Sequence, residues 1–118
     1  MINQFVITTQ RDAQGRFAVI HTDGYINNLA GERIGEEANT LLAEGFRRIV
    51  INMAKSTVIN SIGISILIEV IEKMQEIDGT LAFCNLTKTI AKTFTIMGLA
   101  QYALIYDNEQ EAVRGVLE

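Results

Sequence analysis

A short apolar segment near the middle of the chain runs through a polar loop directly into a long helical pattern. Residues 48–53 (Arg-Ile-Val-Ile-Asn-Met) are rich in β-branched side chains between polar flanks, which is typical of a strand buried on both faces of a sheet. Residues 61–78 then carry apolar side chains at helical spacing and stop before Gly79. A strand that leads into such a helix predicts a strand-helix-strand unit and therefore a layered α/β fold.

The rest of the chain continues this alternation. Two apolar runs, 5–8 and 17–21, flank a polar turn that contains Gly15, and they predict a β-hairpin. Further strands are expected at 80–84 and 102–106, and further helices at 29–44, 85–97 and 109–117. This order predicts one α/β domain over residues 1–118, with a mixed sheet of about four to five strands and about four helices.

Polar residues mark the expected starts of two helices, and glycines lie inside the first of them. Asn27 or Asn28 is expected to cap the helix at 29–44, and Asn60 or Ser61 the helix at 61–78. Their side-chain oxygens can accept hydrogen bonds from the unpaired N–H groups of a first helical turn. Gly31 and Gly35 lie inside the first of these helices, where each costs about 1 kcal/mol relative to alanine. Either they permit close packing or the first turn is irregular.

The helix that starts near Ser61 has an apolar and a polar face. At about 100° per residue, one arc forms the predicted core face: Ile66, Leu67, Val70, Ile71, Met74 and Ile77. The opposite arc holds Ser61, Ser65 and three glutamates, with Ile68 among them and Ile64 at the edge. Apolar residues beside serines on a polar face predict a partner-binding surface that includes Ile64, Ser65 and Ile68. The competing interpretation is that they are ordinary, singly exposed hydrophobic residues.

Ser61 has two possible roles on the evidence of the residues alone. It can cap the helix, or it can accept a phosphate, which would meet unpaired N–H groups and the positive end of the helix dipole. A phosphate would add close to two negative charges to a surface that also carries Glu69 and Glu72. Such a change would oppose the docking of a partner by repulsion and desolvation.

Composition excludes several classes of function. A net charge of −4 without a basic cluster argues against nucleic-acid binding. Cys84 is the single cysteine and His21 the single histidine, so we expect no disulfide within the chain, no metal site and no cofactor. His21 is expected to be an ordinary polar residue at the end of its strand. Because no apolar run approaches ~20 residues and no signal peptide is recognisable, we expect a cytoplasmic protein without membrane insertion.

An enzyme is the competing class of protein. A phosphoacceptor of the response-regulator type needs an aspartate where the central strand ends, but Asn52 and Met53 stand there. Gly63 is isolated rather than part of a glycine-rich phosphate loop, and His21 has no evident catalytic partner. We therefore expect a binding protein rather than an enzyme.

Three segments, in the same order along the chain, match the motifs of one family. Residues 58–64 (Val-Ile-Asn-Ser-Ile-Gly-Ile) match an apolar-Asp-Ser-Ser/Thr-Gly-Leu loop, and residues 24–27 (Gly-Tyr-Ile-Asn) match a Gly-x-Leu-Asp turn. Residues 84–87 together with 94–99 match a strand-helix signature that closes with Gly-Leu. Through these segments the chain resembles the STAS domain family, and within it the single-domain anti-sigma-factor antagonists of bacterial partner-switching systems.

The resemblance implies a phosphorylation switch at Ser61. In that family a kinase that is also an anti-sigma factor phosphorylates the matching serine, a serine phosphatase removes the phosphate, and the unphosphorylated form binds the kinase. The implied phosphosite loop also contains Asn60, Ile62 and Gly63, and Asn27 is placed on the partner surface. Three positions depart from the family pattern: Asn60 and Asn27 stand where aspartate is usual, and Ile62 replaces a serine or threonine. The alternative within the fold is a constitutive binding subunit, as in lipid-transport ATPase complexes.

Overall fold

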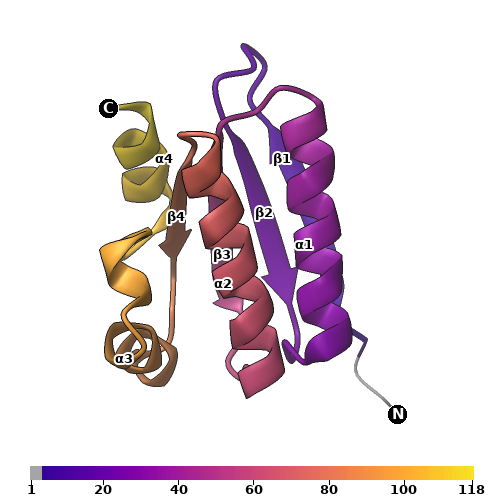
Figure 1. Cartoon of the computed structure of the whole chain (residues 1–118), viewed down its shortest axis with the longest axis vertical. Coiled ribbons are helices and arrows are strands. Elements are labelled where there is room, and N and C mark those ends of the chain that lie inside the picture. Colours follow the sequence, from indigo (N-terminus) through magenta and orange to yellow (C-terminus); the bar gives the residue numbers. More distant parts are fainter. Residues whose placement is uncertain (1–3) are drawn as a thin grey trace.

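Five strands form one sheet in the computed structural model, which describes residues 4–118, and their order in space is their order along the chain (Figure 1). They are β1 (Val6–Arg11), β2 (Ala18–Asp23), β3 (Arg48–Lys55), β4 (Thr80–Cys84) and β5 (Leu104–Tyr106). β1 and β2 form the predicted antiparallel hairpin, and every later pair is parallel. The prediction of a mixed sheet is confirmed.

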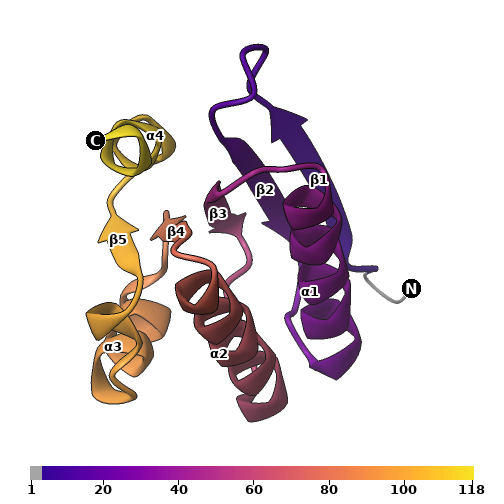
Figure 2. The same ribbon diagram turned by 45° about the horizontal axis from the view of Figure 1, so that its top comes forward.

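Four α-helices cover the two faces of this sheet (Figure 2). They are α1 (Asn28–Ala43), α2 (Ser61–Glu76), α3 (Lys88–Ile96) and α4 (Glu109–Leu117), with a short 3₁₀ helix, η1 (Leu99–Gln101), after α3. The parallel steps all move in one direction across the sheet, so right-handed crossovers place α1, α2 and α3 on the same face. α4 follows the last strand and packs on the opposite face against β3, β4 and β5.

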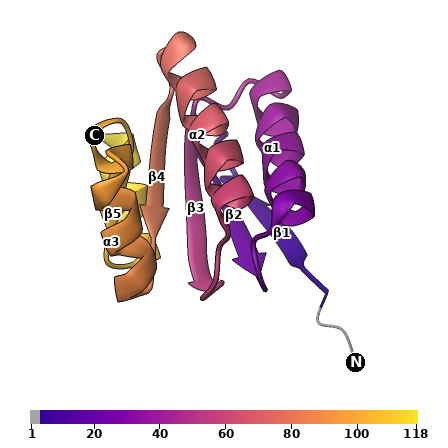
Figure 3. The same ribbon diagram turned by 60° about the horizontal axis from the view of Figure 1, so that its bottom comes forward.

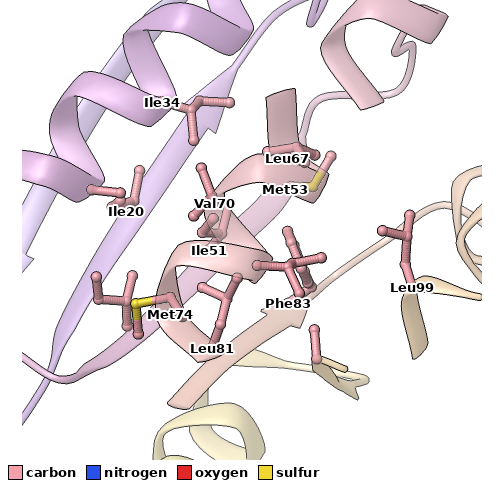
Figure 4. Packing of buried hydrophobic residues seen from close by; sticks show 14 of the residues in the cluster. Ile20, Ile34, Ile51, Met53, Leu67, Val70, Met74, Leu81, Phe83 and Leu99 are labelled. Carbon is pink, nitrogen blue, oxygen red and sulfur yellow. The ribbon is translucent and has the colours of Figure 1, made fainter. Parts of the chain in front are cut away.

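Two apolar cores result, one on each face of the sheet. The larger core joins the sheet to α1, α2 and α3 (Figure 4), and in it Phe83 and Phe94 meet edge to face at 5.1 Å between ring centroids. The smaller core joins the sheet to α4 and includes Val50 and Ala112. Because side chains alternate along a strand, Ile51 faces the larger core and Val50 the smaller one. The β-branched run at 48–53 is therefore buried on both faces, as predicted.

The packing of α2 differs from the prediction at Ile64, which is 5% exposed and lies in the larger core. Leu67, Val70, Ile71 and Met74 are buried as expected, whereas Ile66 and Ile77 are only half-buried. α1 and α2 lie side by side on the sheet (Figure 3). The contacts of α2 with the sheet and with the other elements of the larger core decide which of its residues are buried, and a helical wheel for α2 alone cannot represent this.

Gly31 is the residue that lets α1 approach α2. A β-carbon at this position would lie 3.0 Å from Ile66 Cδ1 and 3.4 Å from Gly63 Cα. Gly31 is itself buried within the regular helix α1. Of the two interpretations that the sequence left open, close packing is therefore confirmed for Gly31, whereas a β-carbon on Gly35 would make only an ordinary contact of 3.8 Å with Ile66 Cγ2.

Two further residues also differ from the predictions, His21 in β2 and Met97 at the end of α3. His21 lies inside β2, which continues to Asp23, and its Nε2 is 2.6 Å from Glu109 Oε1 in the first turn of α4. Asn52 Nδ2 donates to the same carboxylate oxygen at 3.0 Å. Met97 lies in the range 85–97 that was expected to be helical, but α3 ends at Ile96 and the Met97 side chain is half exposed.

Candidate functional site

Two loops at the carboxyl ends of β2 and β3 are tied together. Ile26 and Ile59 form a parallel bridge, in which Ile26 N–H donates to Val58 O and Asn60 N–H donates to Ile26 O, each at 3.0 Å. Gly24 N–H also donates to Lys55 O at 2.9 Å. Because these bonds continue the β2–β3 pairing past the strands, the starts of α1 and α2 are held next to each other.

Asn60 is the N-cap of α2. Its backbone is extended, and its Oδ1 accepts a hydrogen bond from Gly63 N–H at 2.7 Å. Ser61 is therefore the first residue inside the helix and not the cap, which corrects one of the two roles considered for it. An asparagine caps a helix about as well as the aspartate of the family motif, so the local geometry does not require the acid.

Ser61 is exposed at the first position of α2. Its backbone carbonyl accepts a hydrogen bond from Ser65 Oγ at 3.0 Å, one turn further along the helix. The Ser61 hydroxyl itself makes no hydrogen bond to another residue within 4–118. This hydroxyl is available to an enzyme that approaches from solvent.

Gly63 is needed because the backbone of the neighbouring loop comes very close. A β-carbon on Gly63 would lie 2.6 Å from Ile26 O and 3.1 Å from Ile26 Cγ2. The Ile26 carbonyl accepts a hydrogen bond from Asn60 N–H, so it cannot move away from such a β-carbon without breaking that bond. The glycine of the phosphosite loop therefore allows α2 to start directly against the loop at 24–27.

Four exposed apolar side chains come from these two loops and from the first turns of the two helices. They are Tyr25 (48% exposed), Leu29 (65%), Val58 (55%) and Ile62 (53%). We call this set the Ser61 patch. Exposed apolar side chains that gather in one place are typical of surfaces that bind a partner.

The structure brings together most, but not all, of the predicted site residues. Asn60, Ile62 and Gly63 adjoin Ser61 in sequence, and Ser65 is exposed on the next turn of α2. Asn27 is half-buried and caps α1, since its Oδ1 accepts a hydrogen bond from Ala30 N–H at 3.0 Å.

Two predicted members of the partner surface are placed elsewhere. Ile64 is in the core, and Ile68 is half-buried against it instead of lying on an open polar face. The exposed apolar side chains at this end of the sheet are those of the Ser61 patch. Sequence reasoning did not point to Tyr25, Leu29 and Val58, because loop and first-turn residues belong to no periodic pattern. Their signal was position, since each lies two residues from an asparagine cap.

The described residues also bear on three other kinds of feature: a metal site, a reactive thiol and a membrane-spanning helix. Within residues 4–118 no three histidine, cysteine, aspartate or glutamate side chains are placed to hold a metal ion. Cys84 is buried at the end of β4, and burial, aided by the charge of Glu109, raises its pKa to about 12. Its thiol is therefore protonated and unreactive near neutral pH. Within the same range no helix is both long and apolar enough to span a bilayer.

Known proteins resemble this chain in sequence or in fold. A protein from Bordetella bronchiseptica, BtrV, provisionally described as an anti-sigma factor antagonist, is 22% identical over 89 residues, which cover 75% of this chain and 77% of BtrV. A crystal structure from Thermotoga maritima with the same provisional description has a TM-score of 0.84 at 13% identity and 95% coverage of each chain. The Bacillus cell fate determinant SpoIIAA in its phosphorylated form has a TM-score of 0.74 at 20% identity, covering 94% of this chain and 99% of SpoIIAA.

The family assignment comes from a match along most of the sequence. The family model described as STAS domain matches residues 8–112, which run from β1 into α4. The matched range contains both bridged loops and all of α2, the elements that build the surroundings of Ser61. The chain belongs to the STAS domain family.

Proposed function

We propose that this protein is an anti-sigma-factor antagonist that binds an anti-sigma factor through the Ser61 patch and is switched off by phosphorylation of Ser61. The observation that carries the proposal is the free, exposed hydroxyl of Ser61 beside exposed apolar side chains. The descriptions of BtrV and of phosphorylated SpoIIAA support it, since both are relatives of this chain in sequence or fold.

The start of α2 can accommodate a phosphate. Free N–H groups and the positive end of the helix dipole stabilise an anion at this position. The first turns of α1 and α2 contain no acidic residue, and both helices are capped by uncharged amides, Asn27 and Asn60. A phosphate on Ser61 would therefore not meet a carboxylate in the turns that surround it.

The same phosphate would oppose binding. A partner that covers Ile62 and the rest of the Ser61 patch must remove water from Ser61, which lies next to Ile62. Removing water from a group with nearly two negative charges is costly unless the partner supplies matching positive charges. The bridged loops need not move for this effect, because the added charge acts directly at the contact.

The resemblance also assigns the regulators of the switch. The anti-sigma factor would be the serine kinase that modifies Ser61, and a serine phosphatase would restore the active form. The chain would act by binding and not by catalysis, since the hydroxyl of Ser61 has no base beside it within residues 4–118. His21, the only imidazole, is bonded to Glu109 on the α4 side of the sheet.

Phosphorylation can be tested with the purified chain, ATP and the anti-sigma kinase encoded nearest to it in the genome. Intact-mass spectrometry should show one added phosphate on the wild-type protein and none on Ser61→Ala. Ser65→Ala is the matched control, because Ser65 is an exposed serine one turn along the same helix, and it should be labelled like the wild type. Equal labelling of Ser61→Ala, or no labelling of the wild type, would remove the switch from the proposal.

Binding separates this function from a constitutive subunit of a larger complex. Under the proposal, Ser61→Asp weakens binding to the anti-sigma factor by about 100-fold or more, since an unpaired charge is desolvated in the contact. Gln14→Asp is the control, because it places the same charge at an exposed position in the turn between β1 and β2, at the other end of β2 from Ser61. If Ser61→Asp leaves partner binding unchanged, the constitutive subunit becomes the better description.

A further inference from the structure

A second set of exposed apolar side chains lies at the β5 edge of the sheet. It consists of Ile96 (74% exposed), Met97 (50%), Tyr102 (59%) and Leu104 (41%). These residues come from the end of α3, from the segment after η1 and from β5, and η1 contacts both α3 and β5. We call this set the β5-edge patch. The sheet order places β5 at the edge beyond β4 (Figure 2). The Ser61 patch comes instead from the loops that follow β2 and β3 and from the first turns of α1 and α2.

The segment that carries the β5-edge patch, which lies between Asp78 and Asp107, differs in charge from the rest of the chain. Residues 79–106 contain two lysines, Lys88 and Lys92, and no acidic residue, although the whole chain has 14 acids and a net charge of −4. Both lysines are exposed, and within residues 4–118 neither forms an ion pair. Lys88, Lys92 and Ile96 are spaced four residues apart on α3, so they line one side of the helix.

We propose that the β5-edge patch is a docking site for a second protein that presents an acidic amphipathic helix. The apolar side of such a helix would cover Ile96 and Met97, and its carboxylates would pair with Lys88 and Lys92. Complementary charge gives orientation and selects against basic partners, while the apolar side chains supply the buried area. The proposal does not depend on Ser61, because the patch is built from other elements.

The same charges make other occupants less suitable. In a two-fold dimer through this patch, the surface would face its own copy and bring lysines toward lysines. An anionic membrane would attract two lysines but would repel a chain whose net charge is −4. A separate acidic partner satisfies both the apolar side chains and the lysines.

The direct test uses a fluorescently labelled synthetic helix with leucines on one face and glutamates on the other. Fluorescence anisotropy at low ionic strength should show that the full chain binds this peptide at least about tenfold more tightly than a matched peptide with lysines in place of glutamates. Lys88→Glu together with Lys92→Glu should abolish or reverse this preference. Ile96→Gln together with Met97→Gln should weaken binding of the acidic peptide by about tenfold or more.

Three controls test whether the peptide binds at the β5-edge patch and not elsewhere on the protein. Arg48→Glu with Arg114→Glu changes the net charge equally at exposed positions outside the patch. Leu29→Gln removes an exposed apolar side chain from the Ser61 patch, and Ser61→Asp mimics its phosphorylation. Each should leave peptide affinity within about twofold of wild type, since distant, independent sites do not couple. Circular dichroism should confirm that every variant is folded.

Several results would overturn the proposal. They are failure of the acidic peptide to bind, equal affinity for the two peptides, and a loss of affinity in the control variants as large as in the patch variants. Light scattering that shows a dimer abolished by Ile96→Gln with Met97→Gln would assign the surface to a second copy instead. Binding to phosphatidylserine vesicles that Lys88→Glu with Lys92→Glu removes would assign it to a membrane. Failure of Ser61 to become phosphorylated would leave these outcomes unchanged.

Discussion

The junction from β2 to α1 and the junction from β3 to α2 are built from the same parts. Residues 26–30 read Ile-Asn-Asn-Leu-Ala, and residues 59–63 read Ile-Asn-Ser-Ile-Gly. In each, a bridged isoleucine precedes an asparagine cap whose Oδ1 accepts the N–H of the third helical residue. In each, the first and second helical residues are exposed and the third is buried.

The two junctions differ at the first and third helical residues. The first residue is Asn28 in α1 and Ser61 in α2, so only the second junction offers a hydroxyl. The third is Ala30 in α1, where a methyl group is buried without conflict, and Gly63 in α2, where a methyl group would meet Ile26 O. The shared parts explain how each helix begins. The differences show that only α2 has a hydroxyl at its first position and, at its third position, a backbone contact that leaves no room for a methyl group.

The largest expected effect is on Gly63. Gly63→Ala should lower the free energy of unfolding by about 3 kcal/mol, because the added methyl group would press on a hydrogen-bonded carbonyl. Gly35→Ala in α1 is the matched control, since its methyl group would have an ordinary contact of 3.8 Å with Ile66 Cγ2. That change should stabilise the protein by up to about 1 kcal/mol. Urea unfolding measures both, and effects of the same sign would contradict the close contact.

A second serine at the equivalent position would test whether cap geometry alone defines the phosphorylation site. Asn28→Ser combined with Ser61→Ala places the hydroxyl at the first position of α1 instead of α2. We expect the kinase to label it at least about tenfold more slowly than wild-type Ser61, because recognition depends on what surrounds the hydroxyl. Initial rates with radiolabelled ATP provide the measurement. Equal rates would show that the two junctions are interchangeable.

The two caps should contribute equally. Asn60→Ala and Asn27→Ala should each lower the free energy of unfolding by about 1 kcal/mol, because each leaves one helical N–H without its partner. Asn60→Asp should change it little, since aspartate caps equally well and its charge suits the helix dipole. Thermal unfolding at neutral pH compares the three variants. If Asn60→Ala leaves the free energy of unfolding unchanged, the bridged loops hold the start of α2 in place without its cap.

The smallest effect on stability is expected at the exposed second residues. Leu29→Gln and Ile62→Gln should each change the free energy of unfolding by less than about 0.5 kcal/mol, since both side chains are already in water. Ile62→Gln should nevertheless weaken binding of the anti-sigma factor. Chemical unfolding and calorimetric titration together separate the two effects, and a large loss of stability would mean that these side chains belong to the core.

The order of strands and helices, the hairpin and the helix starts at asparagines were predictable because they depend on residues close in sequence. The β-branched run at 48–53 and the glycines after helices are local signals of this kind. Ser61 could also be identified, because a serine between a strand and a helix matches a family motif over a few residues.

What the sequence could not provide depends on how elements pack. The burial of Ile64 is decided by the larger core that α2 joins, and the exposure of Met97 by where α3 ends. The pairing of His21 with Glu109 joins residues 88 positions apart, so no residue near His21 in the sequence predicts it. The Ser61 patch is assembled from two loops that meet only through the Ile26–Ile59 bridge.

The agreement between strand order in space and in sequence has a consequence for synthesis on the ribosome. Each strand that emerges pairs with the strand made just before it, so the sheet can grow from β1 toward β5 without waiting for a later segment. α4 is the exception, because its Glu109 returns to His21 and Asn52 in strands made much earlier. We expect this carboxylate to form its bonds last, after β5 has joined the sheet.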